Sequence, residues 1–111
     1  MGNSSKVKQL RICERVWEVK FLPTVLDDDD NGAKGTTDEE SQVIEVSNKL
    51  AGDAQRSTLL HEALHAAIKT SLNSHPDDEE KCVQGLETAL YSMLRCKKNK
   101  WFWKYMMEDD D

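Results

Sequence analysis

The chain has 111 residues, of which 38% are hydrophobic and 32% charged, and its formal net charge is −6. This length corresponds to one domain, and the composition is typical of a folded globular protein rather than a disordered one. The negative charge argues against a general nucleic-acid-binding role, and no apolar stretch is long enough to span a membrane.

The N-terminal residues are polar and lack the apolar core of an export signal. The cysteines number three, and an odd count without an export signal favours reduced thiols. From these two features we expect a cytoplasmic protein.

Residues 16–22 alternate apolar and polar side chains, which predicts a half-buried strand that ends before Pro23. The strand could begin near Leu10, with a break around residues 14–15. A second short strand is predicted at residues 42–46. We expect the two strands to pair as an antiparallel hairpin.

The connection between these strands, residues 27–40, is acidic and contains glycine, and we expect it to be a solvated loop. Beyond the second strand, residues 54–72 form the strongest predicted helix, with Asp53 as its N-cap after Gly52. Apolar residues surround most of this helix. A helix of that kind is central and packed on more than one side.

A second helix is predicted from Pro76 to about residue 97, because acidic residues follow the proline and an apolar stripe runs along its length. The remaining residues, 98–111, are an aromatic cluster followed by an acidic tail. We expect the aromatic side chains to fold back and complete a small core.

The first predicted helix carries the sequence His61-Glu62-Ala63-Leu64-His65. Histidines four residues apart lie about 40° apart around a helix, so both imidazoles can reach one metal ion. Glu62 lies on the flank of this pair. Zinc lowers the pKa of a bound water toward ~7, and a carboxylate in that position can take a proton from the water. The His-Glu-x-x-His motif therefore predicts a zinc site with Glu62 as the catalytic base.

A catalytic zinc usually has three protein ligands and one open position. Helix geometry alone leaves four residues open as the third ligand, namely Glu80, Glu87, Glu79 and His75. His75 does not have the spacing of the extended metzincin motif, which needs a histidine where this chain has Ser71.

Residues 58–66, with the sequence TLLHEALHA, resemble the active helix of small gluzincin-type metallopeptidases, in particular the ImmA/IrrE-like enzymes and compact phage-encoded zincin-like proteins. This resemblance implies that Zn²⁺ is bound by His61, His65 and Glu80. Glu80 has the expected position, which is three residues before the core residue Val83. It also implies that an edge strand at residues 42–46 holds the substrate backbone.

We therefore expect an α+β fold, a minimal zincin-like domain in which a short antiparallel hairpin packs on two helices that carry the metal site. The expected function is hydrolysis of a peptide or protein substrate, in which Glu62 assists the attack of zinc-bound water. The alternative is a zincin-fold module that binds a protein partner, with or without zinc, and has no peptidase activity. Neither nucleic acid nor a membrane is an expected partner.

Overall fold

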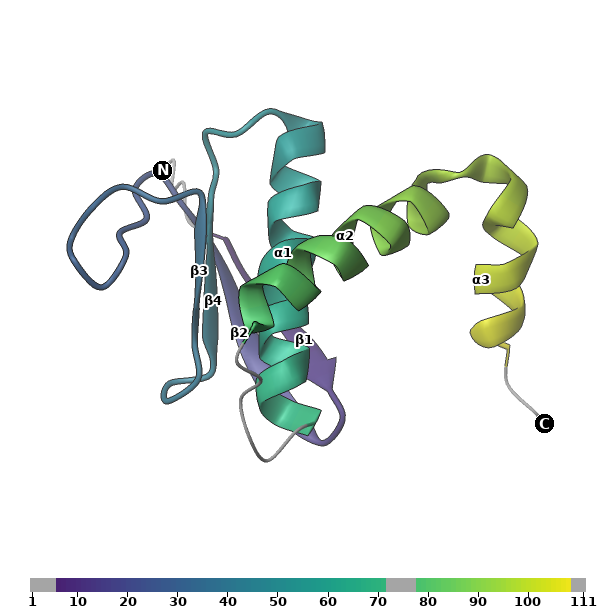
Figure 1. The fold of residues 1–111 in the computed structure, drawn as a ribbon, viewed down its shortest axis with the longest axis horizontal. Coiled ribbons are helices and arrows are strands. Elements are labelled where there is room, and N and C mark those ends of the chain that lie inside the picture. The colour runs from purple at the N-terminus through teal and green to yellow at the C-terminus, as the bar shows by residue number, and fades with distance from the viewer. Residues whose placement is uncertain (1–5, 72–77, 109–111) are drawn as a thin grey trace.

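A four-stranded mixed sheet and three α-helices form the described part of the chain, which in this computed structural model is residues 6–71 and 78–108 (Figure 1). The expected α+β class is confirmed. The elements, in chain order, are β1 (Lys6–Ile12), β2 (Arg15–Leu22), β3 (Gly35–Asp38), β4 (Val43–Ser47), α1 (Gly52–Ser71), α2 (Glu79–Arg95), the short 3-10 helix η1 (Lys97–Asn99) and α3 (Lys100–Met106). Within the described residues, no helix has both the length and the apolar character needed to cross a membrane.

The sheet has the strand order β1-β2-β4-β3. The expected break near residues 14–15 is a tight turn between β1 and β2, which pair as an antiparallel hairpin. Cys13 enters this turn with a φ of 55°, a left-handed conformation that is uncommon for a side-chain-bearing residue.

The expected antiparallel hairpin between residues 16–22 and 42–46 is wrong. β2 and β4 pair in parallel, with Val19 opposite Ile44. The reason lies in the segment predicted to be a loop, residues 27–40, because its last part forms β3 and runs back along the sheet antiparallel to β4. This extra reversal gives β4 the same direction as β2.

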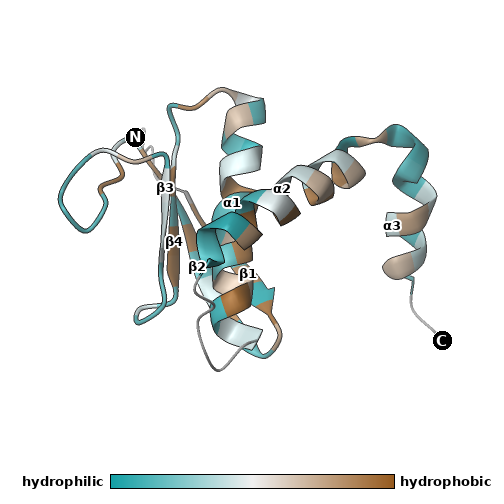
Figure 2. Ribbon diagram, viewed as in Figure 1, coloured by the Kyte–Doolittle hydropathy of each residue, from teal (hydrophilic) through white to brown (hydrophobic). Residues whose placement is uncertain are grey.

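The core lies between the sheet and α1. Alternate apolar side chains of β2 and β4 face the helix, and Figure 2 shows β4 as largely hydrophobic beside a mostly hydrophilic loop between β2 and β3. The buried cluster consists of Trp17, Val19, Ile44, Val46 and Ala66. Trp17 is fully buried, and its indole N–H donates a hydrogen bond to Thr70 Oγ1 at 3.2 Å. Such a partner satisfies the one polar group of the largest core side chain.

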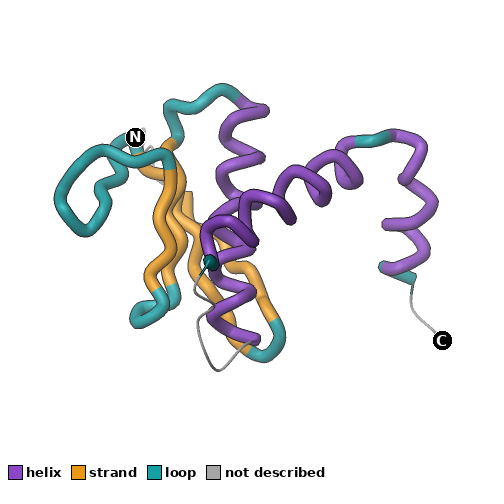
Figure 3. The backbone as a smooth tube through the Cα atoms, in the orientation of Figure 1, coloured by secondary structure: helices purple, strands orange, loops and turns teal. Residues whose placement is uncertain are grey.

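Helix α1 is central, as expected, because it lies between the sheet and α2 (Figure 3). Its start differs from the prediction. The helix begins at Gly52, so Asp53 lies in its first turn rather than at the N-cap. There the Asp53 carboxylate accepts a hydrogen bond from the Tyr91 hydroxyl of α2. An acidic side chain in this turn also interacts favourably with the helix dipole.

Helix α2 begins at Glu79, and only Val83 of α2 is buried. Beyond it, α3 projects away from the sheet (Figure 1). Trp101 is 68% exposed and Tyr105 65% exposed, so the expectation that the aromatic cluster completes the core is wrong. The radius of gyration, 15.0 Å, exceeds the ~13 Å typical of a domain this size because the end of α2 and α3 form an arm that extends away from the sheet (Figure 1).

Candidate metal centre

The two motif histidines lie on successive turns of α1 and face α2. Both are half-buried, and their ring centroids are 5.0 Å apart. Helix periodicity brings the rings together, and the apolar residues around them place this stretch between the sheet and α2.

Glu80, in the first turn of α2, reaches both histidines. One of its carboxylate oxygens lies 3.2 Å from His61 Nε2, and the other lies 2.8 Å from His65 Nε2. One ligand atom from each of the three residues can be chosen so that all lie within 4.8 Å of one another. Among the residues that the structure describes, this is the one such group of three or more histidine, cysteine or carboxylate side chains.

These distances are those of hydrogen bonds and ion pairs, and they place the three side chains closely enough to hold a metal ion. Zinc lies about 2.0–2.2 Å from imidazole nitrogen and carboxylate oxygen, so two ligand atoms of a tetrahedral site are roughly 3.3 Å apart. The separations of 3.2 and 2.8 Å from Glu80 to the two histidines are close to that value. Two imidazoles and one carboxylate also match a catalytic zinc site with an open position.

The other two candidate glutamates contact the opposite nitrogen of each ring. Glu87 Oε1 lies 2.8 Å from His61 Nδ1, and Glu79 Oε2 lies 2.5 Å from His65 Nδ1. Lys69 in turn lies 3.4 Å from Glu79. A carboxylate on Nδ1 holds the proton there and directs Nε2 toward a metal. Glu79 and Glu87 are thus placed as outer partners of the histidines.

The fourth candidate ligand, His75, lies outside the described residues. The different contacts that the three glutamates make with the histidines follow from the way α2 crosses α1. Its first turn brings Glu79 and Glu80 to the histidines, and Glu87, two turns later, still reaches His61.

The nearby carboxylates also favour the charged form of His61. Burial acts to lower the pKa of His61, but the hydrogen bond to Glu87 and the charges of Glu80, Glu62 and Glu87 outweigh it, and the pKa lies above 6.5. Burial acts to raise the pKa of Glu80, yet its interactions with His65, His61 and Gln84 bring it below 4.5. The negative charges that favour a proton on His61 also favour a metal cation at this position.

Glu62 is buried beside the histidines, on the side of the helix that faces β3. The Thr37 hydroxyl lies 2.6 Å from Glu62 Oε1, to which it can donate a hydrogen bond, and 3.0 Å from the Glu62 carbonyl oxygen. Gly35 allows this close approach, because a Cβ there would lie 2.8 Å from Thr58 Cγ2 and 3.0 Å from Glu62 Cγ. One hydrogen bond leaves further acceptor positions on the Glu62 carboxylate.

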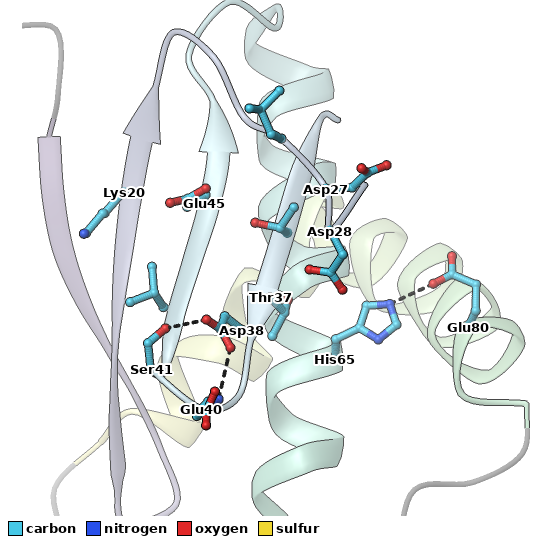
Figure 4. Close-up of a pocket in the computed structure, with 13 residues that line it drawn as sticks. Lys20, Asp27, Asp28, Thr37, Asp38, Glu40, Ser41, Glu45, His65 and Glu80 are labelled. Carbon is cyan, nitrogen blue, oxygen red and sulfur yellow. Dashed lines mark hydrogen bonds and ion pairs between the residues drawn. The ribbon is translucent and has the colours of Figure 1, made fainter. Parts of the chain in front are cut away.

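Two hollows flank the metal-ligand group. The smaller, about 350 Å³, is lined in part by His61, Glu62 and Lys34. The larger, about 1030 Å³, is lined by His65 and Glu80 together with the edge of the sheet and the loop before β3 (Figure 4). We call the larger one the acidic groove; its carboxylates are Asp27, Asp28, Asp38, Glu40, Glu45 and Glu80.

The strand next to the site is not the one expected. Residues 42–46 correspond to β4, which is paired on both sides, whereas β3 is the edge strand on the side of the metal-ligand group. The Lys34 carbonyl accepts a hydrogen bond from Ser47 N–H at 2.8 Å. Since main-chain groups alternate in direction along an antiparallel strand, those of Gly35 and Thr37 point away from β4.

Comparison with protein-family models, with curated proteins and with solved structures gave no match. The geometry of the site therefore carries the functional argument. Three contributors to that geometry, Gly35, Thr37 and the edge strand itself, had no signal in the sequence, because GTTD has neither apolar alternation nor a motif.

Proposed function

We propose that the chain is a zinc-dependent peptidase of the zincin type, with zinc held by His61, His65 and Glu80. The observation that carries this proposal is the meeting of both Nε2 atoms with one carboxylate at near-ligand distances, while Glu62 lies beside them. When bound, zinc supplies a Lewis acid that polarises a peptide carbonyl and acidifies a water molecule.

In this proposal Glu62 is the general base. Its carboxylate takes a proton from the attacking water and passes it to the leaving amine. Thr37 holds one oxygen of Glu62 and so orients the carboxylate. Glu79 and Glu87 orient the imidazoles through Nδ1.

An extended peptide can lie along β3. The main-chain groups of Gly35 and Thr37 that point away from β4 can pair with it, which is strand addition to a sheet edge. This arrangement brings a peptide bond beside Glu62, since Thr37 contacts Glu62 directly. In this proposal β3, rather than residues 42–46, holds the substrate backbone.

The test compares the zinc-loaded wild type with Glu62→Gln on a mixture of fluorogenic peptides. The amide of glutamine can still accept the Thr37 hydrogen bond, so fold and zinc content should be unchanged. General-base catalysis contributes about 10²–10⁴-fold, and we expect peptide cleavage to fall by at least ~100-fold. Glu18→Gln, on the exposed side of β2, is the matched control and should cleave normally.

A second candidate is a binding module that keeps the metal group but does not cleave. It is favoured by the exposed apolar side chains of the arm, among them Trp101, Tyr105 and Met106. A wild type with one zinc per chain and no cleavage of any peptide would support this candidate over the peptidase.

A further inference from the structure

The acidic groove has a strongly one-sided charge. Among the residues that line it, six are carboxylates and Lys20 is the one lysine or arginine. Figure 4 shows that these carboxylates come from the sheet, from the loop before β3 and from α2. The groove is open to solvent at its surface and continues to His65, a ligand in the proposed zinc site.

Neutral donors, rather than cations, hold the carboxylates of Asp27 in the loop and Asp38 at the end of β3. Asp27 accepts hydrogen bonds from the N–H groups of Asp29 and Asn31, both at 2.9 Å. Asp38 accepts from the Ser41 hydroxyl at 2.8 Å and from the Glu40 N–H at 3.1 Å. Such bonds fix the side chains and leave their negative charge in place.

No lysine or arginine among the described residues lies within ion-pair distance of the groove carboxylates. Lys20 lies opposite Glu45 across β2 and β4 and offsets one charge at most. A concave surface with one sign of charge concentrates cations in the groove.

Apart from Glu80, the groove carboxylates do not form a group of three or more ligands that could share one metal ion. In the described chain, only His61, His65 and Glu80 converge closely enough to share an ion. The other groove carboxylates are distributed over a hollow of about 1030 Å³. Distributed negative charges match an extended ligand with several cationic groups.

The position of the groove identifies that ligand. Its wall includes Thr36, Thr37 and Asp38 of the edge strand together with His65 and Glu80. The groove passes around β3, because His65 and Glu80 line it on the α1 side, whereas Glu45 alternates with the buried Ile44 and Val46 and lines it on the opposite side of the sheet. An extended peptide along β3 directs alternate side chains to both sides of the sheet and so passes beside carboxylates on each side.

We propose that the acidic groove binds a basic segment of the substrate, containing at least two lysines or arginines next to the bond that is cleaved. This inference rests on the proposed peptidase function and names its substrate class. Asp28 and Glu45 are the specificity-determining residues, because each lines the groove from a different element and neither is a proposed zinc ligand.

The test uses two labelled ten-residue peptides of equal length and apolar content, one with four lysines and the other with four glutamates. Binding is measured by fluorescence anisotropy on zinc-loaded Glu62→Gln, which should not cleave, and on metal-free wild type. We expect the lysine peptide to bind both proteins at 50 mM salt and to bind at least ~10-fold more weakly at 500 mM, because salt screens exposed charges.

The matched variants are Asp28→Asn with Glu45→Gln, and Asp29→Asn with Glu18→Gln. Both pairs remove two negative charges, but the second pair does not line the groove. We expect the first pair to weaken binding of the lysine peptide about 5- to 10-fold and the second pair to change it less than twofold. Equal weakening by both pairs, or equal binding of the two peptides, would overturn the inference.

Cleavage of the same peptides separates this inference from the proposed function. If the lysine peptide binds through the groove but wild type cleaves neither peptide, the groove assignment stands and the peptidase function fails. If zinc-loaded wild type cleaves both peptides at equal rates, the peptidase function stands and the substrate class is wrong.

Discussion

Replacing each of the three glutamates by glutamine should separate the zinc ligand from its outer partners. Glu80→Gln removes the carboxylate that reaches both Nε2 atoms. Glu79→Gln and Glu87→Gln change groups that contact Nδ1 of a single ring, and the amide oxygen can still accept that hydrogen bond. We therefore expect zinc affinity to fall most for Glu80→Gln.

The expected loss of zinc affinity differs between a ligand and an outer partner. Structural zinc binding of about 10–16 kcal/mol over four ligands is roughly 3 kcal/mol per ligand, so losing one ligand costs more than ~100-fold in affinity. Losing the charge of an outer partner typically costs about 10- to 100-fold. Glu18→Gln, an exposed position on β2, should change the affinity less than twofold.

Competition with a metal indicator gives the affinities, and cobalt in place of zinc gives a second readout. The visible absorption of bound cobalt depends on the ligand atoms and their geometry. It should change for Glu80→Gln and remain unchanged in Glu79→Gln and Glu87→Gln. A changed spectrum in Glu87→Gln with an unchanged one in Glu80→Gln would refute the assignment of the third ligand.

Three further predictions concern stability. Val83→Ala should lower the unfolding free energy by about 2 kcal/mol and weaken zinc binding, because it truncates the one buried side chain of α2. Denaturant unfolding measures the loss of stability, and a variant that keeps full zinc affinity would contradict this prediction. Gly35→Ala should cost about 1–3 kcal/mol through overpacking against α1, whereas Gly32→Ala, whose Cβ would meet nothing within 4 Å, should change stability by less than ~0.5 kcal/mol. Metal-free protein should have its highest melting temperature between pH 4.5 and 6.5: the raised pKa of His61 stabilises below 6.5 and is lost as pH rises, and the lowered pKa of Glu80 stabilises above 4.5 and is lost as pH falls. Zinc should extend this stability above pH 6.5, since it binds unprotonated imidazole, and a metal-free maximum at pH 8 would contradict the reasoning.

The parts of the fold that repeat a local pattern could be predicted from the sequence. The two long helices, the strand ending before Pro23 and the His61–His65 pair all depend on periodicity within one element. The sheet topology could not, because a four-residue polar strand decides whether residues 16–22 and 42–46 run parallel or antiparallel.

The sequence also does not reveal which glutamate contacts which nitrogen of the two histidines. Glu79, Glu80 and Glu87 all lie on one helix, and their contacts with the histidines depend on how α2 crosses α1. The resemblance to gluzincins predicts Glu80 as the third ligand, and in the structure Glu80 lies in the one described group that could hold a metal ion; its role as a ligand stays a prediction. The exposure of Trp101 was missed because composition does not reveal the direction in which a terminal helix leaves the domain.

The shortness of the edge strand limits what can attach to it. Of the four residues of β3, two direct their main-chain groups outward, so an added strand gains few backbone hydrogen bonds. At this edge, a second molecule of the protein cannot extend the sheet over any length. In the proposed peptidase, the same limit would leave side chains and the metal to provide most of the affinity for a bound peptide, and the cleaved halves would leave quickly.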